Sequence, residues 1–157
     1  MSPIIVSRHR SILAAFAIVI AVIVATFPAL AVSPVNTNGG DAAISGYDPV
    51  AYFTAGKPTK GSDQFTATWN GTVFRFASAE NRDTFQAAPE KYAPQYGGYC
   101  AWAVSQGYTA TIDPRAWKVV DGKLYLNYSK GIQRRWERDE ANLIVTADKN
   151  WPGIVGE

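Results

Sequence analysis

Two dipeptides, Asn70-Gly71 and Asp121-Gly122, constrain this chain most, because each lies between two stretches in which apolar and polar residues alternate. Asn-Gly and Asp-Gly favour the tight type I′ turn that joins antiparallel strands. The flanking stretches are residues 64–69 and 72–77 for the first turn, and residues 117–120 and 123–127 for the second. Pairing around the turns gathers apolar side chains on one face of each hairpin: Phe65, Ala67, Trp69, Phe74 and Phe76 in the first, and Trp117, Val119, Leu124 and Leu126 in the second. The sequence therefore predicts two antiparallel hairpins, each with one buried face.

Helix signals lie between and after these hairpins. Asp48-Pro49 has the form of a capping residue followed by proline at the first helical position, and Ser78 and Ser129 are also good capping residues. Helices or single turns are predicted over residues 49–53, 79–87, 89–92 and 99–105, with a turn after Asp113-Pro114 and the longest helix from about 129 to just before Trp151-Pro152. Since no strand–helix–strand alternation occurs, we expect an α+β fold of two antiparallel β-hairpins, short helices and a longer C-terminal helix.

The N-terminal 31 residues have the three parts of a secretory signal peptide. Arg8 and Arg10 precede an apolar run over residues 12–27, and Ala29 and Ala31 occupy the two small positions before a cleavage site. We expect cleavage after Ala31 and a periplasmic or secreted protein; the alternative is an uncleaved anchor in the inner membrane. Residues 32–43 are rich in Ser, Pro, Asn and Gly and are predicted to be a flexible linker, and residues 44–157 a single domain.

The predicted mature chain has no excess of either charge. The sequence contains 15 basic and 13 acidic residues, and the leader holds two of the basic residues, Arg8 and Arg10, and no acidic residue. A nucleic-acid partner would need a basic face, so none is expected. The membrane is expected as a partner only through an uncleaved leader, whereas a small ligand or an envelope protein fits a neutral domain. Oligomeric state is left open.

The inventory of reactive side chains is small. The chain has one cysteine, Cys100, and its single histidine and methionine, His9 and Met1, both lie in the leader. One cysteine cannot form a disulfide within its own chain, and no histidine is left to act as a base or metal ligand. We therefore expect no enzyme activity, and a small hydrolase ranks last among the alternatives. No cofactor is required by the sequence, although a metal ion stays possible.

Residues 46–92 contain a recognisable series of motifs: Asp48-Pro49-Val50, the first hairpin, the run from Phe76 to Phe85, and Pro89-Glu90-Lys91-Tyr92. In these motifs the segment resembles the YHS domain family. Later motifs, among them residues 97–103 and 121–128, resemble an exported bacterial subgroup of YHS domain-containing proteins that implies no settled activity.

Typical members of the family carry cysteines that help to bind a metal, and this chain departs from the family at those positions. Ala51 stands where the first cysteine would be, and Ala77 and Asn81 stand where the other two would be. Alanine has no ligand atom, and an amide cannot replace a thiolate for a soft metal. The resemblance therefore implies the scaffold and not the metal function.

Cys100 lies outside that segment, in Gly97-Gly98-Tyr99-Cys100-Ala101-Trp102. If it lies in the first turn of a helix, backbone amides would favour a thiolate, and the thiol would be a redox centre, a nucleophile or a single metal ligand. The alternative is an inert thiol packed among aromatic residues. Both readings stay open, and Cys100 is the candidate functional thiol.

Carboxylates and aromatic residues are the other candidates. Asp48, Asp113 and Asp121 are explained by capping and turn roles, and no calcium-loop pattern occurs. A groove lined by Tyr and Trp would suit a small ligand or a partner surface, and a tyrosine-rich core is the alternative. The candidate pocket residues are Asp48, Tyr52, Tyr99 and Trp102. The leading hypothesis is an exported, non-catalytic binding or structural module of the cell envelope; the alternative is a metal-binding or thiol-redox protein centred on Cys100.

Overall fold

The computed structural model describes residues 32–156. The predicted signal peptide, residues 1–31, lies outside the described residues. Within residues 32–156, no helix has the length and apolar character needed to cross a membrane.

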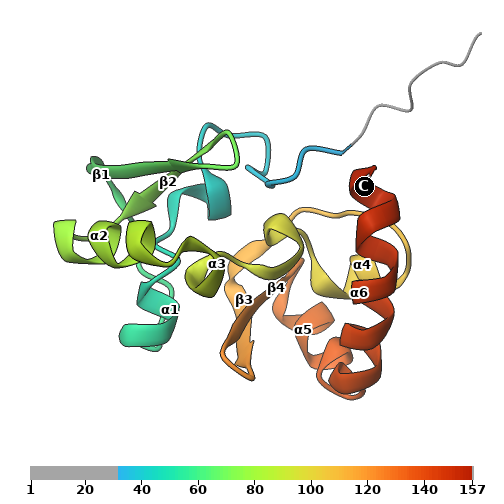
Figure 1. Cartoon of the computed structure of the whole chain (residues 1–157). Helices are drawn as coiled ribbons and strands as arrows, with labels where there is room; N and C mark the ends of the chain where they lie inside the picture. Colours follow the sequence, from blue (N-terminus) through green and yellow to red (C-terminus); the bar gives the residue numbers. More distant parts are fainter. Residues whose placement is uncertain (1–31, 157) are drawn as a thin grey trace, which may run out of the picture.

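Most of the described chain forms two units that follow one another in sequence (Figure 1). The first unit comprises the 3₁₀ helix η1 (Ala43–Gly46), α1 (Ala51–Thr54), β1 (Ser62–Trp69), β2 (Thr72–Phe76) and α2 (Ala79–Ala87). The second comprises η2 (Gln95–Gly98), α4 (Ala101–Ser105), β3 (Asp113–Val120), β4 (Lys123–Asn127) and α5 (Lys130–Trp136). The short helix α3 (Pro89–Tyr92) lies between the units, and α6 (Glu140–Val155) follows them. The α+β prediction is confirmed.

Both predicted hairpins form around the predicted turns. Asn70 and Asp121 have φ angles of 47° and 49°, and the glycine after each has a φ of 72°. These left-handed angles at both turn residues are those of the type I′ turn, which is why Asx-Gly is needed there. Each hairpin is a separate two-stranded antiparallel sheet. In the second sheet Trp117 pairs with Leu126, as the alternation predicts.

The two units repeat one plan at an interval of about 51 residues. A bulge in the first hairpin follows the pair of Ser62 with Phe76, and a bulge in the second follows the pair of Asp113 with Asn127, 51 positions further along the chain. A serine caps the helix after each hairpin.

The serine caps and the link into each unit correspond in the same way. Ser78 accepts a hydrogen bond from Asn81 N at 3.1 Å, and Ser129 accepts one from Ile132 N at 3.3 Å. The chain before each hairpin also binds alike, because Asp48 N donates to Thr59 O and Cys100 N donates to Ala110 O. These matched contacts make the second unit a structural repeat of the first.

The main core joins the two units. One cluster of buried residues includes Phe74 and Phe85 from the first unit and Leu124 and Leu126 from the second. A second cluster, around Trp136, packs α6 against α4 and β4. Phe85 in the first unit and Trp136 in the second are fully buried at equivalent places, and we call them the aromatic anchors. Truncating a buried aromatic residue of this kind to alanine costs about 3–5 kcal/mol.

The C-terminal region differs from the prediction of one long helix. The chain turns at Glu137–Asp139, and helix α6 then runs through Pro152 to Val155. The turn lets α6 pack against α4, and Trp136 is fully buried in a cluster that includes Val104 of α4 and Ala147 of α6. The last turn of α6 continues past the proline, with Trp151 packed at 6.0 Å from both Tyr96 and Tyr99.

Two other local predictions are also corrected. Asp113-Pro114 begins β3 instead of a turn, and Asp113 accepts a hydrogen bond from Arg115 N at 2.9 Å. Helix α4 begins at Ala101, two residues later than predicted, because Cys100 has an extended ψ of 114°.

The segment predicted as a flexible linker, residues 32–43, packs against the domain. Val35 is only 2% exposed, and Asn36 N donates to Gly97 O at 2.9 Å. Gly97 allows this close approach, since a Cβ atom there would lie 1.9 Å from Pro34 O. Composition indicated a linker because the residues are small and polar, but Asn36 is bonded to η2 through both its backbone N–H and its side-chain amide.

Candidate functional site

Asp48 is a fully buried carboxylate that acts as a local hub. It lies just before α1, where its Oδ1 accepts hydrogen bonds from Val50 N at 2.8 Å and Ala51 N at 3.3 Å. Its Oδ2 accepts from Ala77 N at 2.9 Å and from Asn81 Nδ2 at 2.6 Å. Four donors compensate the cost of burying the charge, and they fasten α1 to the end of β2 and to α2.

The three positions that correspond to family cysteines therefore meet at one point. Ala51 and Ala77 present backbone N–H groups to Asp48, and Asn81 presents its side-chain amide. These residues do not fit a metal, because two have no ligand atom and the amide of the third is turned as a donor toward the carboxylate. Within residues 32–156, no group of three or more His, Cys, Asp or Glu side chains could hold a metal ion.

Cys100 is a buried thiol with a raised pKa. Its side chain is 1% exposed, and it precedes the first helical residue of α4. Burial raises the pKa of the Cys100 thiol, and nearby backbone N–H groups, including that of Tyr128, offset only part of the rise. A reactive cysteine needs a lowered pKa and access to solvent, so this environment is that of a packed thiol.

The repeat explains why a cysteine occupies this place. Cys100 lies 52 positions after Asp48 and is its counterpart, and Tyr128 lies 51 positions after Ala77 and is its counterpart. Tyr128 N donates to Cys100 Sγ at 3.3 Å, just as Ala77 N donates to Asp48 Oδ2. Asn127 Oδ1 lies 3.7 Å from the sulfur and accepts from Trp102 N at 3.3 Å. The thiol thus takes the role that the carboxylate takes in the first unit.

A small cavity of about 230 Å³ lies next to Cys100. Its wall is mainly apolar and aromatic, with Trp102, Tyr108 and Tyr128 among the lining residues. Trp102 meets Tyr108 edge to face at 6.3 Å and carries the guanidinium group of Arg135 over its ring at 4.9 Å. The cavity provides apolar contact with no charged side chain in its lining.

The four residues predicted to share a pocket lie in separate places. Asp48 is enclosed by its donors, and the hydroxyl of the buried Tyr52 donates to Pro114 O at 2.8 Å. Tyr99 packs against Trp151, and Trp102 lines the cavity beside Cys100. These side chains serve packing in different parts of the domain, so the structure does not bring them together as one site.

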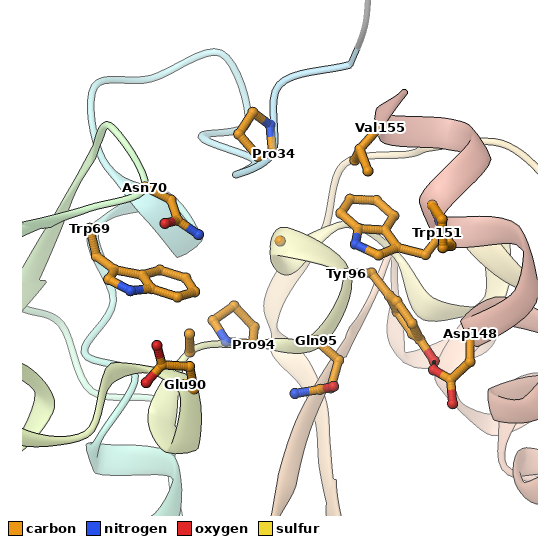
Figure 2. A pocket seen from close by; sticks show the side chains of 13 residues that line it. Pro34, Trp69, Asn70, Glu90, Pro94, Gln95, Tyr96, Asp148, Trp151 and Val155 are labelled. Atoms are coloured by element: carbon orange, nitrogen blue, oxygen red, sulfur yellow. Dashed lines mark hydrogen bonds between the residues drawn. The ribbon is translucent and has the colours of Figure 1, made fainter. Parts of the chain in front are cut away.

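A larger cavity, of about 400 Å³, opens between the first unit and α6 (Figure 2). We call it the inter-unit groove. Figure 2 shows Trp69, at the end of β1, on one side of the space and Trp151 of α6 on the other. Pro34 lies above the space in this view and Pro94 below it, and Glu90 and Asp148 lie along the lower edge.

The side of the groove formed by α6 contains a buried tyrosine. Tyr96 donates a hydrogen bond from its hydroxyl to Asp148 Oδ1 at 2.8 Å. Burial, and secondarily the bond to Asp148, raises the pKa of Tyr96, so the phenol stays neutral and keeps donating. This wall therefore combines two aromatic rings with an oriented carboxylate.

The sequence predicted a groove lined by Tyr and Trp but did not identify the residues of this one. It missed Trp69, Trp151 and Glu90, which come from three elements far apart in the chain. One feature of the sequence did point to Trp69: it directly precedes the predicted turn at Asn70-Gly71, so it had to lie at the tip of the hairpin. Nothing local indicated that α6 would return to face that tip.

Comparison with known proteins agrees with this geometry. Residues 50–96 match the family model of the YHS domain, and this segment runs from α1 through α3 to the first two residues of η2. A comparison with curated proteins gave no significant match, and a comparison with solved structures gave none either. The protein therefore carries a YHS domain over residues 50–96.

Proposed function

We propose that this protein is an exported, non-catalytic binding module of the cell envelope, and that the inter-unit groove is its binding site. One observation carries the proposal: the larger of the two cavities described above has two tryptophans from different parts of the chain in its walls, together with the polar side chains of Asn70, Glu90, Gln95 and Asp148. Clefts with aromatic walls and a few placed polar groups are typical of small-ligand sites. The signal-peptide pattern supports a periplasmic or secreted location.

The state of the other candidate groups supports binding over catalysis. The carboxylate of Asp48 is occupied by four internal donors, and the thiol of Cys100 is buried with a raised pKa. Neither group is held in a form suited to attack a substrate or to transfer a proton near neutral pH.

A metal-binding or thiol-redox protein centred on Cys100 is the second candidate. The cavity beside the sulfur favours it, because a soft metal complex or an oxidant entering there would reach the thiol. Such a function would need the side chains of Tyr108 and Tyr128, both largely exposed, to admit the reagent.

Elemental analysis of the purified native protein separates the two candidates. The binding-module proposal predicts far less than one equivalent of zinc or copper per chain, both in the wild type and in Cys100→Ser. Stoichiometric metal that survives purification and is lost in Cys100→Ser would overturn it in favour of the second candidate. An intact mass that begins at Val32 would support export with cleavage, and a mass that includes earlier residues would refute cleavage.

A further inference from the structure

We propose that the inter-unit groove binds a small organic cation, with an alkylated ammonium group held between the two tryptophans. This inference rests on the proposed binding function and adds the chemical class of the ligand. It follows from the aromatic walls, from the charges at the groove and from the rigidity of both walls.

The first wall presents a fixed indole beside a carboxylate. Trp69 packs edge to face against Phe74 at 6.1 Å and against Phe85 at 6.3 Å, so its ring is held by the core of the first unit. Glu90, in the first turn of α3, lies below it in Figure 2 and is exposed to solvent.

The second wall is a corner of two rings beside another carboxylate. The rings of Tyr96 and Trp151 lie 6.0 Å apart at an interplanar angle of 59°. Tyr96 also orients Asp148 by donating to Oδ1. The two walls thus each combine tryptophan with an acidic side chain, and they face each other across the cavity.

The charges at the groove select the sign of the ligand. Of the thirteen lining residues, Glu90 and Asp148 are acidic and none is basic. No salt bridge engages either carboxylate within residues 32–156. The neighbouring Lys91 is held over the ring of Tyr92 at 5.0 Å and does not line the groove.

Cation–π attraction and two carboxylates act in the same direction. The face of an indole attracts an ammonium group within about 6 Å, and alkylated ammonium ions lose little hydration on entering such a site. An anion would meet two like charges, and a neutral molecule of the same shape would gain only apolar contact.

The test compares choline with its neutral isostere, 3,3-dimethylbutan-1-ol, by NMR titration of ¹⁵N-labelled protein. The chain has five tryptophans, so the indole N–H signals report location directly. We expect choline to shift the signals of Trp69 and Trp151 and to leave those of Trp102, Trp117 and Trp136 in place. The neutral isostere should bind at least about ten-fold more weakly.

Charge variants give an independent measure. Asp148→Asn and Glu90→Gln keep the shape of each side chain and should each weaken choline binding by about five-fold, the size expected for one exposed charge pair. Asp139→Asn is the matched control. Asp139 is an exposed acidic residue directly before α6, the helix that carries Asp148, and it does not line the groove. It should leave choline affinity unchanged.

Each other outcome has a defined meaning. Equal affinity for choline and the isostere would overturn the cation proposal and leave the binding-module proposal supported by a groove that takes apolar ligands. Shifts confined to Trp102, or no shift of any indole with choline, would also overturn the cation proposal. The binding-module proposal is tested separately by the metal content, so its failure is distinguishable.

Discussion

Replacing Asp48 by asparagine should destabilise the domain strongly although the two side chains have the same shape. In the wild type, Oδ2 of Asp48 accepts from Ala77 N at 2.9 Å and from Asn81 Nδ2 at 2.6 Å. The substitution places an NH₂ group opposite these two donors. Asn81 can rotate its amide and present its oxygen, which restores one bond, but the backbone N–H of Ala77 loses its acceptor.

The magnitude follows from one lost charge-assisted bond and one unsatisfied backbone donor. A hydrogen bond to a charged group contributes about 1.5–3 kcal/mol, and an unsatisfied buried donor costs about 1–3 kcal/mol. The lost bond and the unsatisfied donor belong to the same broken contact, so the two values cannot simply be added. We therefore expect Asp48→Asn to lower the free energy of unfolding by about 3 kcal/mol. This is a large part of the 5–15 kcal/mol that is typical of a domain.

Urea unfolding followed by tryptophan fluorescence measures this loss as a shift in midpoint at constant m-value. Asp121→Asn is the control: Asp121 is exposed at a hairpin turn with a φ of 49°, a conformation that asparagine also accepts. It should change the free energy of unfolding by less than about 0.5 kcal/mol. A loss below about 1 kcal/mol for Asp48→Asn would refute the role of Asp48 as a hub.

Three further predictions concern other parts of the domain. Gly97→Ala places a Cβ atom 1.9 Å from Pro34 O, so it should release the segment around Asn36, seen as faster amide exchange there; unchanged protection would contradict the packing of residues 34–36. Cys100 should be alkylated slowly in native protein at pH 8 and rapidly after addition of denaturant, because burial raises its pKa, whereas equal rates would show an accessible thiol. Burial also raises the pKa of Tyr125 to about 12, so its neutral form stabilises the folded state below the unfolded pKa of about 10, and this contribution is lost as the pH rises from about 10 to 12. Tyr125→Phe should therefore make the fall in unfolding free energy over that interval shallower, and an unchanged slope would contradict the assignment.

Features that depend on neighbouring residues could be predicted from the sequence. The hairpin turns need left-handed angles that Asn70-Gly71 and Asp121-Gly122 supply, and the capping role of Ser78 follows from its place before a helical pattern. The resemblance to the YHS domain gave the positions of Ala51 and Ala77, although not their meeting at Asp48.

Features that depend on distant contacts could not be predicted. The composition of residues 32–43 is that of a linker, whereas the segment is held by distant partners, Asn36 by η2 and Asn38 by Ile112. Pro152 suggested a helix end, and the helix continues with Trp151 packed on Tyr96. The inter-unit groove results from both of these long-range contacts, so its residues have no common local pattern.

The repeat had a signal in the sequence that local reasoning did not use. The spacing of 51 residues links Asn70-Gly71 to Asp121-Gly122, and Phe85 to Trp136. Few residues are identical between the units, because each aromatic anchor packs against a different surface. The second unit could be found by aligning three features at this spacing: the Asx-Gly turns, the capping serines Ser78 and Ser129, and the buried aromatic residues Phe85 and Trp136.

The YHS scaffold is kept in this protein, and a hydrogen-bonded cluster around Asp48 stands where a metal site would need thiolates. Zinc titration of the wild type and of the triple variant Ala51→Cys, Ala77→Cys, Asn81→Cys tests it most directly, with circular dichroism to verify that both are folded. We expect no stoichiometric zinc binding by the wild type and one tightly bound zinc in the folded triple variant, because the three positions meet at one carboxylate. One equivalent of zinc on the wild type, or none on a folded triple variant, would contradict it.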